Sequence, residues 1–436
     1  MISKYRTIKT SIPAPESLSI LKDLEKYESR SMHEQLPIVW DRAEDFQVFD
    51  RWGNCWIDFT STIFVANTGH SNPAIIKALK KQLDQKLIHT YTFPHEIRAR
   101  FLKKLIGVTP AYLTRAFLLS SGTEATECAI KLMRMYGQTI NPQKLGIISF
   151  KGNMHGRTMA AEMLKGDPAS SSWVGYRDPN IRHLPFPCCQ KSSFSRDIQK
   201  LEKESLDIDK VCGFMIESYQ GWSAKFYPQP YIKDLCDFAE RHNILITFDD
   251  IQGGFGRTGK LFAYQHYNVE PDLVCLGKGL GGGLPLSAVL GRGEIMNLPK
   301  TGSMSSTHSA NPLCCAAALA NLEELYRKDL IEESARKGKL LYTYLAKLEK
   351  RYPRYIFYVY GRGLLAAIIV VNTKFASQVC ENAMRKGLLL VHTGRESIKI
   401  GPPLTIPDDA LLEGLAVLDE SIVEVMKRKL DVRMIK

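Results

Sequence analysis

Residues 244–259 read ILITFDDIQGGFGRTG, in which an apolar run leads into two adjacent carboxylates, Asp249 and Asp250, and then a glycine-rich turn. Such an apolar run is typical of a strand that is buried on both faces of a parallel sheet. Neighbouring side chains of a strand point to opposite faces, so the two aspartates cannot reach one ligand. We expect one aspartate to face a site at the carboxyl end of the strand and the other to hold the following loop. We expect no metal site here.

Strand-like and helix-like segments alternate on both sides of this stretch, from about residue 71 to residue 325. The strand-like runs are AFLLS (116–120), KLGIISF (144–150), VCGFMIE (211–217) and DLVCLG (272–277), and helices are predicted over 123–137 and 231–243. This alternation predicts an α/β fold with a mostly parallel sheet covered by helices on both faces. Ligands of such sheets bind where strands end and loops begin.

Both ends of the chain predict a second, smaller α+β domain. Residues 1–70 contain a polar arm, a helix and a hairpin-like segment at 48–59. Residues 326–436 begin with a long helix, and strand-like and helical segments follow it. We therefore expect a large domain over 71–325 and a small domain that combines 1–70 with 326–436.

Composition indicates an ordinary globular protein and argues against a membrane-spanning or secreted one. Of the 436 residues, 44% are hydrophobic and 24% are charged, as in ordinary globular domains. The longest apolar run, LLAAIIVV from Leu364, is too short to cross a bilayer, and the first residues lack the apolar core of a signal peptide. The ten cysteines show no CxxC spacing. These features predict a soluble cytoplasmic protein with reduced thiols and no membrane partner.

The net charge of +12 raises the question of a nucleic-acid partner. The basic residues are spread over the whole length and are interleaved with acidic and apolar residues. We predict a solvated basic surface and no nucleic-acid partner. Part of the excess positive charge would lie in a cleft that binds an anionic cofactor or substrate. A non-catalytic protein, either a cofactor-holding regulator or a basic nucleic-acid binder, is kept as an alternative.

The turn in LLSSGTEATECAIKL predicts a phosphate site. Ser121, Gly122 and Thr123 lie where a strand-like run ends and a helix begins. Backbone N–H groups and two hydroxyls would meet there at the positive end of a helix dipole. The structural alternative is that Ser121 and Glu124 form a capping box that only stabilises the helix.

Lys278 lies directly after a short apolar strand, in a run with five glycines from Gly277 to Gly283. A solvated lysine is the alternative, but few side chains crowd this one. Apolar surroundings would lower the pKa of its amine and suit it to Schiff-base chemistry. Pyridoxal phosphate needs three kinds of group, and the sequence offers all of them. A phosphate-binding turn can hold its phosphate, a strand-end aspartate its ring nitrogen, and this lysine its aldehyde.

At these residues the sequence resembles the class III aminotransferases, which are pyridoxal-phosphate enzymes of fold type I. DDIQGGFGRTG at 249–259 is similar to the family's DEVQTGFGRTG. The resemblance extends from DRWGNCWIDFTSTIFVANTGHSNP at 50–73 to IGPPLTIPDD at 400–409. It implies a large domain with a seven-stranded, mostly parallel sheet, a smaller α+β domain from both termini, and a homodimer whose active sites are shared across the interface.

The resemblance implies a role for each matching position. Lys278 would form the Schiff base and Asp249 would pair with the pyridinium nitrogen, so these two are the expected catalytic residues. Ile251 would pack on one face of the cofactor ring, Gln252 would hydrogen-bond the ring hydroxyl, and Thr307 would reach the phosphate from the neighbouring subunit. The other implied cofactor-binding residues are Ser121, Gly122, Thr123, Met154, His155 and Glu217.

Three positions depart from the family pattern. Met154 replaces an aromatic residue that stacks on the cofactor, and its polarizable thioether can still cover a ring. Lys399 replaces an arginine that grips an α-carboxylate, and Trp222 replaces a glutamate that masks this arginine. The substrate-binding residues that the resemblance implies are Ile63, Arg157, Trp222 and Lys399.

Lysine cannot reproduce the planar, two-pronged grip of arginine on a carboxylate. We therefore expect an amine with bulky or hydrophobic parts, or a sugar-like or polyamine substrate, in preference to the glutamate and 2-oxoglutarate pair. Arg157 remains as another carboxylate contact. The alternative is that Lys399 is an ordinary surface residue and that recognition lies elsewhere.

The function predicted from these features is transamination. An amino group would move from an amine or amino-acid donor to a keto or aldehyde acceptor in a ping-pong mechanism, with Lys278 moving the proton. The alternative is a racemase, epimerase or aminomutase of the same fold, because such an enzyme would share the lysine, the aspartate and the phosphate-binding site.

Overall fold

The computed structural model describes residues 1–33, 36–187 and 191–434. The chain forms two compact units. Unit 1 consists of Met1–Asn72, Trp222–Ala224 and Asp329–Lys436, and unit 2 consists of Pro73–Gly221 and Lys225–Lys328. Unit 1 is thus assembled from both ends of the chain, with a short segment from the middle.

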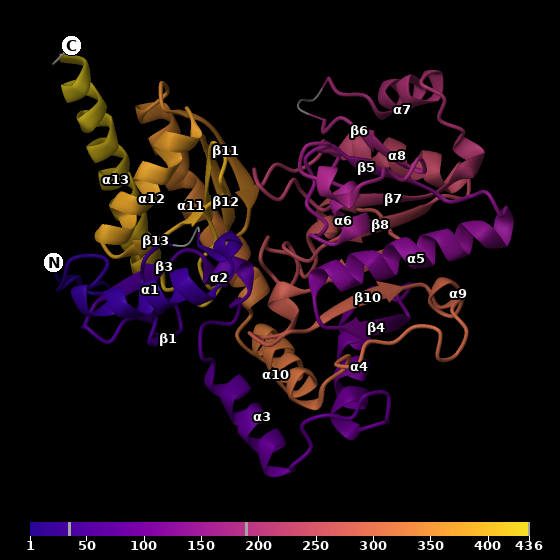
Figure 1. Cartoon of the computed structure of the whole chain (residues 1–436), viewed down its shortest axis with the longest axis horizontal. Coiled ribbons are helices and arrows are strands. Elements are labelled where there is room, and N and C mark those ends of the chain that lie inside the picture. The colour runs from indigo at the N-terminus through magenta and orange to yellow at the C-terminus, as the bar shows by residue number, and fades with distance from the viewer. Residues whose placement is uncertain (34–35, 188–190, 435–436) are drawn as a thin grey trace. The chain divides into compact units, whose positions relative to one another are not determined.

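Unit 2 is built around a seven-stranded sheet (Figure 1). Its strands are β4 (Arg115–Leu119), β5 (Gly146–Phe150), β6 (Ile181–Leu184), β7 (Val211–Glu217), β8 (Leu245–Asp249), β9 (Leu273–Leu276) and β10 (Ser287–Gly291). They lie in the order β4-β10-β9-β8-β7-β5-β6. The strands from β9 to β6 run parallel, and β10 runs antiparallel to both of its neighbours. The predicted α/β fold with a mostly parallel seven-stranded sheet is confirmed.

Helices cover both faces of this sheet (Figure 1). α5 (Gly122–Ile140) follows β4, precedes β5 and packs against β7, β9 and β10. α7 (Phe194–Lys203) and α8 (Gln229–Arg241) connect strands in the opposite direction across the sheet, from β6 to β7 and from β7 to β8. Right-handed crossovers that run in opposite directions place their helices on opposite faces. All residues of β5, β7, β8 and β9 are buried, as this covering requires.

The other helices of unit 2 include α10 (Pro312–Arg327) and the two helices that pack against it. They are α3 (Pro73–Asp84), α4 (Glu96–Val108), α6 (Met159–Met163), α9 (Gly293–Met296) and α10 (Pro312–Arg327), with the 3-10 turns η3 (Ser172–Val174), η4 (Ile208–Lys210), η5 (Ala263–Tyr267) and η6 (Lys278–Leu280). α10 packs against α3 and α4. Ile75, Ala317 and Ala320 form a small apolar core between α3 and α10.

The N-terminal part of unit 1 contains the hairpin that the sequence predicts. β2 (Gln47–Phe49) and β3 (Cys55–Asp58) pair antiparallel. The Asp50 side chain accepts hydrogen bonds from the backbone N–H groups of Trp52 and Asn54, each at 2.9 Å. An aspartate that satisfies the backbone two residues ahead in this way closes the turn.

Both ends of the chain combine in the two sheets of unit 1. β1 (Arg42–Glu44) pairs with β2, and β13 (Leu388–Leu389) pairs parallel with β3. The second sheet is antiparallel and consists of β11 (Ile356–Arg362), β12 (Leu365–Val370), β15 (Ser397–Ile400) and β14 (Val391–His392), in that order. The helical elements are η1 (Pro15–Ser17), α1 (Leu18–Tyr27), η2 (Arg30–Met32), α2 (Ser61–Phe64), α11 (Leu330–Arg351), α12 (Thr373–Arg385) and α13 (Asp408–Met434).

The short helix α2 is a left-handed turn. Its four residues have φ values of +45°, +52°, +62° and +68°. This region is strained for β-branched residues such as Thr62 and Ile63. The Ser61 hydroxyl donates a hydrogen bond to the Gly401 carbonyl at 2.7 Å, which holds the turn against the end of β15. Ile63 is left 44% exposed, whereas Phe64 is buried.

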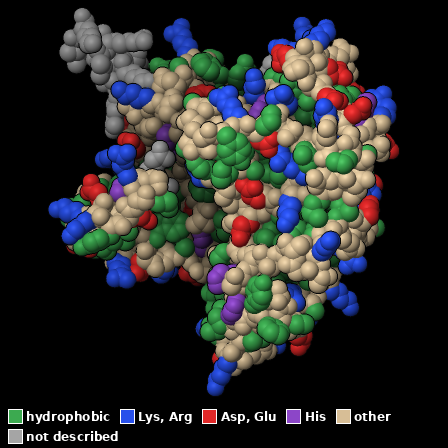
Figure 2. All heavy atoms as spheres, turned by 45° about the vertical axis from the view of Figure 1, so that its right-hand side comes forward, with side chains coloured by type: hydrophobic (Ala, Val, Ile, Leu, Met, Phe, Trp, Pro, Cys, Tyr) green, Lys and Arg blue, Asp and Glu red, His purple; other side chains and the backbone are tan. Residues whose placement is uncertain are grey.

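Charged side chains of both signs share the surface. On the face shown in Figure 2, lysine and arginine side chains are scattered among acidic and apolar ones and do not gather into one basic patch. No helix in the described ranges is both long and apolar enough to span a membrane.

Candidate active site

Two neighbouring parallel strands end in acidic residues at the same edge of the unit 2 sheet. β7 ends at Glu217 and β8 ends at Asp249, and the two residues are register partners. Asp249 Oδ2 lies 2.9 Å from His155 Nδ1, and His155 Nε2 lies 3.2 Å from Ser149 Oγ. Asp249 and His155 are both buried. The histidine, itself held by Ser149, therefore orients the Asp249 carboxylate.

Asp250 has different partners from Asp249. Its Oδ2 accepts a hydrogen bond from the backbone N–H of Ala263 at 2.7 Å. Burial raises the pKa of the Asp250 carboxyl to about 7. Asp250 thus fastens the segment that follows the glycine-rich turn, in agreement with the separate roles that strand alternation predicts.

Lys278 follows β9, the strand beside β8, and begins the turn η6. Its φ of +42° is uncommon for a residue with a side chain. Burial lowers the pKa of its amine, and the Asp249 and Glu217 carboxylates act in the opposite direction. The Asn321 side chain of α10 donates a hydrogen bond to the Gly279 carbonyl at 2.8 Å and so holds the turn. The lowered pKa agrees with the prediction made from the glycine-rich surroundings.

The start of α5 contains the capping box that the sequence suggests. Ser121 Oγ accepts a hydrogen bond from the Glu124 N–H at 3.4 Å, and Glu124 Oε2 accepts one from the Ser121 N–H at 2.7 Å. Gly122 and Thr123, the next residues, line a cavity. A Cβ atom on Gly122 would lie 3.0 Å from Ile251 Cδ1. The first turn of α5 therefore packs closely against the residue that follows the aspartate pair.

Glu217 connects the strand edge to two loops. Its Oε2 accepts hydrogen bonds from the backbone N–H groups of Met154 at 3.0 Å and Gly221 at 3.2 Å. Burial raises the pKa of the Glu217 carboxyl to about 7; the Asp249 carboxylate adds to this effect and His155 opposes it. Glu217 is therefore harder to ionise than a solvated glutamate.

A cavity of about 100 Å³ lies at this edge of the sheet within unit 2. The residues predicted from the sequence that line it are Gly122, Thr123, Met154, His155, Glu217, Asp249, Ile251, Gln252 and Lys278. An amine, a carboxylate, a helix N-terminus and an apolar side chain thus surround one space.

Four lining residues were missed by the sequence reasoning: Gly156, Ser218, Tyr219 and Gly253. The Tyr219 hydroxyl donates a hydrogen bond to Gln252 Oε1 at 3.2 Å. Gly156 has a φ of +146°, and a Cβ atom there would lie 2.2 Å from Thr123 Oγ1. The glycine next to the histidine in MHGRT was the available signal for this close approach.

Three predicted residues of unit 2 do not line this cavity: Ser121, Arg157 and Thr307. Arg157 and Thr307 are both exposed. Thr307 lies in the loop between α9 and α10, and its neighbour Ser306 donates a hydrogen bond to Glu124 Oε1 at 3.4 Å. The Thr307 loop therefore passes beside the start of α5 of the same chain.

The other predicted substrate residues, Ile63, Trp222 and Lys399, belong to unit 1. Lys399 lies in β15 and is only 2% exposed, and its Nζ lies 4.4 Å from the centroid of the Phe64 ring. The alternative that Lys399 is an ordinary surface residue is therefore wrong. Trp222 is partly buried, and the Arg395 guanidinium lies over its ring.

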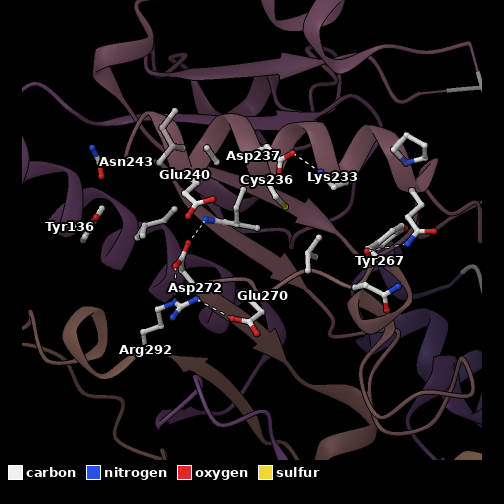
Figure 3. Close-up of a pocket in the computed structure, with 18 residues that line it drawn as sticks. Tyr136, Lys233, Cys236, Asp237, Glu240, Asn243, Tyr267, Glu270, Asp272 and Arg292 are labelled. Atoms are coloured by element: carbon white, nitrogen blue, oxygen red, sulfur yellow. Dashed lines mark hydrogen bonds and ion pairs between the residues drawn. The ribbon is translucent and has the colours of Figure 1, made fainter.

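A larger cavity, of about 840 Å³, lies at the other ends of the same strands (Figure 3). It is lined by residues at the start of β8 and before β9, including Leu245 and Asp272. Several of its charged groups pair with one another, as Arg292 does with Asp272 at 3.0 Å and with Glu270 at 3.9 Å. Because ligands of parallel sheets bind at the carboxyl ends of strands, we place the candidate active site at the cavity that Lys278 lines.

The chain is similar over most of its length to proteins of one known family. The family model for Aminotransferase class-III matches residues 28–422. The chain is 34% identical over 430 residues to the mitochondrial ornithine aminotransferase of Rattus norvegicus, covering 96% of this chain and 93% of that protein. It is 34% identical over 415 residues to the acetylornithine aminotransferase of Methanocaldococcus jannaschii, covering 93% of this chain and 98% of that protein.

A solved structure shows the same likeness in three dimensions. The acetylornithine aminotransferase from Elizabethkingia anophelis matches with a TM-score of 0.79 at 30% identity, over 94% of this chain and 99% of that chain. These relatives favour transamination over the racemase, epimerase, aminomutase and non-catalytic alternatives. The chain belongs to the class III aminotransferases and is a pyridoxal-phosphate-dependent aminotransferase.

Proposed function

We propose that Lys278 is the reactive amine of this aminotransferase and that Asp249 is the carboxylate that matches the ring nitrogen of pyridoxal phosphate. One observation carries this assignment: a lysine whose pKa is lowered by burial lines the same cavity as an aspartate held by a histidine. General bases work best when their pKa lies near the operating pH, so the lowered pKa suits the Lys278 amine to proton transfer.

The residues around the cavity fit the cofactor. The N-terminus of α5 at Gly122 and Thr123 suits a phosphate, since backbone N–H groups and the helix dipole favour an anion there. Gly156 keeps this space open, because a Cβ atom on it would collide with Thr123 Oγ1. Ile251 and Met154 offer apolar and thioether surfaces for the two faces of a ring. Asp249 supplies the acceptor that a protonated ring nitrogen needs.

Each residue then has a task in the reaction. When bound, pyridoxal phosphate supplies an electron sink for the charge that develops on the substrate carbon. Lys278 Nζ would take the proton from that carbon and deliver it to the cofactor carbon that carried the aldehyde, so that the donor would leave as a carbonyl compound and the amino group would stay behind. Asp249, oriented by His155, keeps the ring nitrogen protonated, and Glu217 fixes the loop that carries Met154 through the backbone N–H group.

We further propose a donor that presents a primary amine remote from an α-carboxylate. The relatives are named ornithine and acetylornithine aminotransferases. Lys399, which stands where relatives of the resembled type use an arginine, is buried with its ammonium over Phe64 and cannot form a two-pronged grip. This arrangement supports a substrate other than the glutamate and 2-oxoglutarate pair.

We also propose a cytoplasmic homodimer in which Thr307 contacts the phosphate of the partner's cofactor. The exposure of Thr307 supports this proposal, because an exposed side chain is available to a partner subunit. The eight cysteines that the structure describes are free, and all except Cys236 are buried, which suits a reducing compartment.

The test is a donor panel run on the purified holoenzyme and on Lys278→Ala. The visible absorption of the bound cofactor is followed after addition of α-amino acids, ω-amino acids, diamines and amino sugars in turn. We expect the wild type to respond to at least one donor and Lys278→Ala to respond to none. Lys260→Ala, which removes an exposed lysine of unit 2, is the control and keeps the wild-type response. A response that persists in Lys278→Ala would refute the assignment.

A further inference from the structure

Tyr219 and Gln252 belong to two neighbouring loops at the edge of the unit 2 sheet that carries the candidate active site. Tyr219 follows the end of β7 and Gln252 follows the end of β8, and these strands are parallel neighbours. Both side chains line the same cavity as Lys278. The Tyr219 hydroxyl donates a hydrogen bond to Gln252 Oε1 at 3.2 Å. The ends of two adjacent strands thus bring a phenol and an amide together beside the reactive lysine.

The Tyr219 ring is held in place by its surroundings. Tyr219 is only 2% exposed, and its ring centroid lies 5.1 Å from that of Phe226. A Cβ atom on Gly253 would lie 2.9 Å from Tyr219 Cε1, so this glycine lets the ring pack against the backbone of the residue next to Gln252. These contacts restrict the ring and, with it, the position of the hydroxyl.

The Tyr219 hydroxyl keeps its proton. Burial holds the pKa of the Tyr219 phenol well above its usual value, and the carboxylates of Asp250 and Glu217 act in the same direction. Among the residues that the structure describes, Gln252 is the only hydrogen-bond partner of this hydroxyl. Because a buried hydroxyl is normally paired, its proton is used in the bond to Gln252.

This bond sets the direction of the Gln252 amide. A side-chain amide has an acceptor oxygen at one end and two N–H donors at the other. With Oε1 turned to Tyr219, the amide offers an N–H donor to a ligand in the cavity. A neutral hydrogen bond of ordinary strength favours the orientation that makes it by about fivefold.

We propose that Tyr219 is a positioning residue, which turns Gln252 so that an amide N–H, and not the amide oxygen, meets the ring oxygen of pyridoxal phosphate. This inference rests on the proposed function. The ring oxygen lies next to the carbon that carries the aldehyde and bears negative charge, so an N–H donor stabilises it. Tyr219 acts on the cofactor through Gln252.

The test is a pH titration of the visible absorption of the holoenzyme. The nitrogen of the Schiff base loses its proton as pH rises, and a negative ring oxygen beside it favours the protonated form. A donor on the ring oxygen weakens this effect. Gln252→Leu, which removes the donor, should therefore raise the midpoint of the titration by about one pH unit, a tenfold change. Asp249, Glu217 and His155 line the same cavity and are present in every variant, so their contributions cancel.

Tyr219→Phe keeps the ring and its packing on Phe226 and removes only the hydroxyl. The midpoint should rise in this variant too, by no more than in Gln252→Leu. The double variant Tyr219→Phe/Gln252→Leu should titrate as Gln252→Leu does, because the hydroxyl acts only through the amide. Tyr231→Phe is the matched control and should keep the wild-type midpoint. Tyr231 is also 2% exposed and donates to Asp197 Oδ2 at 2.9 Å, but it does not line the cavity.

The outcomes separate this inference from the proposed function. If the wild type shows no visible band that is lost in Lys278→Ala, the proposed function fails. If the band is present and Gln252→Leu lowers the midpoint, the amide oxygen faces the ring and the inference is refuted, whether or not the tyrosine variant folds. It is also refuted if Tyr219→Phe has the circular dichroism and the midpoint of the wild type, or if the shift of the double variant is the sum of the single shifts.

Discussion

Glu217→Gln should change the way in which stability depends on pH. Burial raises the pKa of Glu217 from 4.5 to about 7. A carboxyl whose pKa is raised in the folded state contributes stability that is present below pH 4.5 and is lost as pH rises through 7. At about 1.4 kcal/mol per pKa unit, ionisation at pH 8 costs the wild type about 3 kcal/mol. Glutamine resembles the protonated acid and can still accept the N–H groups of Met154 and Gly221, so the variant avoids this cost.

The assay is urea unfolding of the apoenzyme at several pH values between 5 and 8, followed by circular dichroism. The free energy of unfolding of Glu217→Gln should exceed that of the wild type by an amount that grows with pH. Glu202→Gln, an exposed glutamate on α7, is the control and should show no such trend. Asp250 is present in both proteins, so its contribution to the pH dependence of stability cancels when the two are compared. A difference that stays constant from pH 5 to pH 8 would show that Glu217 is not the titrating group.

Two other substitutions test the site and the left-handed turn. Asp249→Asn should slow the half-reaction with amine donors at least about hundredfold, because the ring nitrogen loses its charged partner. Stopped-flow absorbance measures this rate. A variant that reacts as fast as the wild type would refute the role proposed for Asp249. Ile63→Gly should raise the free energy of unfolding by about 1 kcal/mol, because glycine adopts a φ of +62° without strain and this gain exceeds its entropic cost. A lowered midpoint of thermal unfolding for Ile63→Gly would mean that the side chain stabilises the turn more than its backbone strains it.

The buried strands of unit 2 could be predicted because their signal is local. The apolar run before Asp249 can be buried only in a sheet that is covered on both faces, and the sheet has this form. The spacing of Asp249, Lys278 and the turn at Gly122 likewise indicated one site, and the structure brings these residues to one cavity. Strand ends of a parallel sheet meet at one edge, so local patterns sufficed here.

Features that depend on distant contacts could not be read from the sequence. The stretch STIF contains β-branched residues that favour a strand, yet it forms a left-handed turn held by Gly401, far along the chain. The burial of Lys399 depends on its pairing with β12 and on Phe64 beneath its ammonium. The competition at Ser121 between capping and phosphate binding also stayed open, because both use the same motif.

The pairing of β13 with β3 has a consequence for synthesis of the chain on the ribosome. Leu388 lies opposite Ile57, so about 330 residues must be translated before β3 gains this neighbour. At about 5–20 residues per second, the nascent hairpin waits about 15 to 70 s with one edge uncovered. Uncovered strand edges recruit other chains. Slow elongation late in the message, or a truncated transcript, should therefore direct this protein toward inclusion bodies while the early residues are intact.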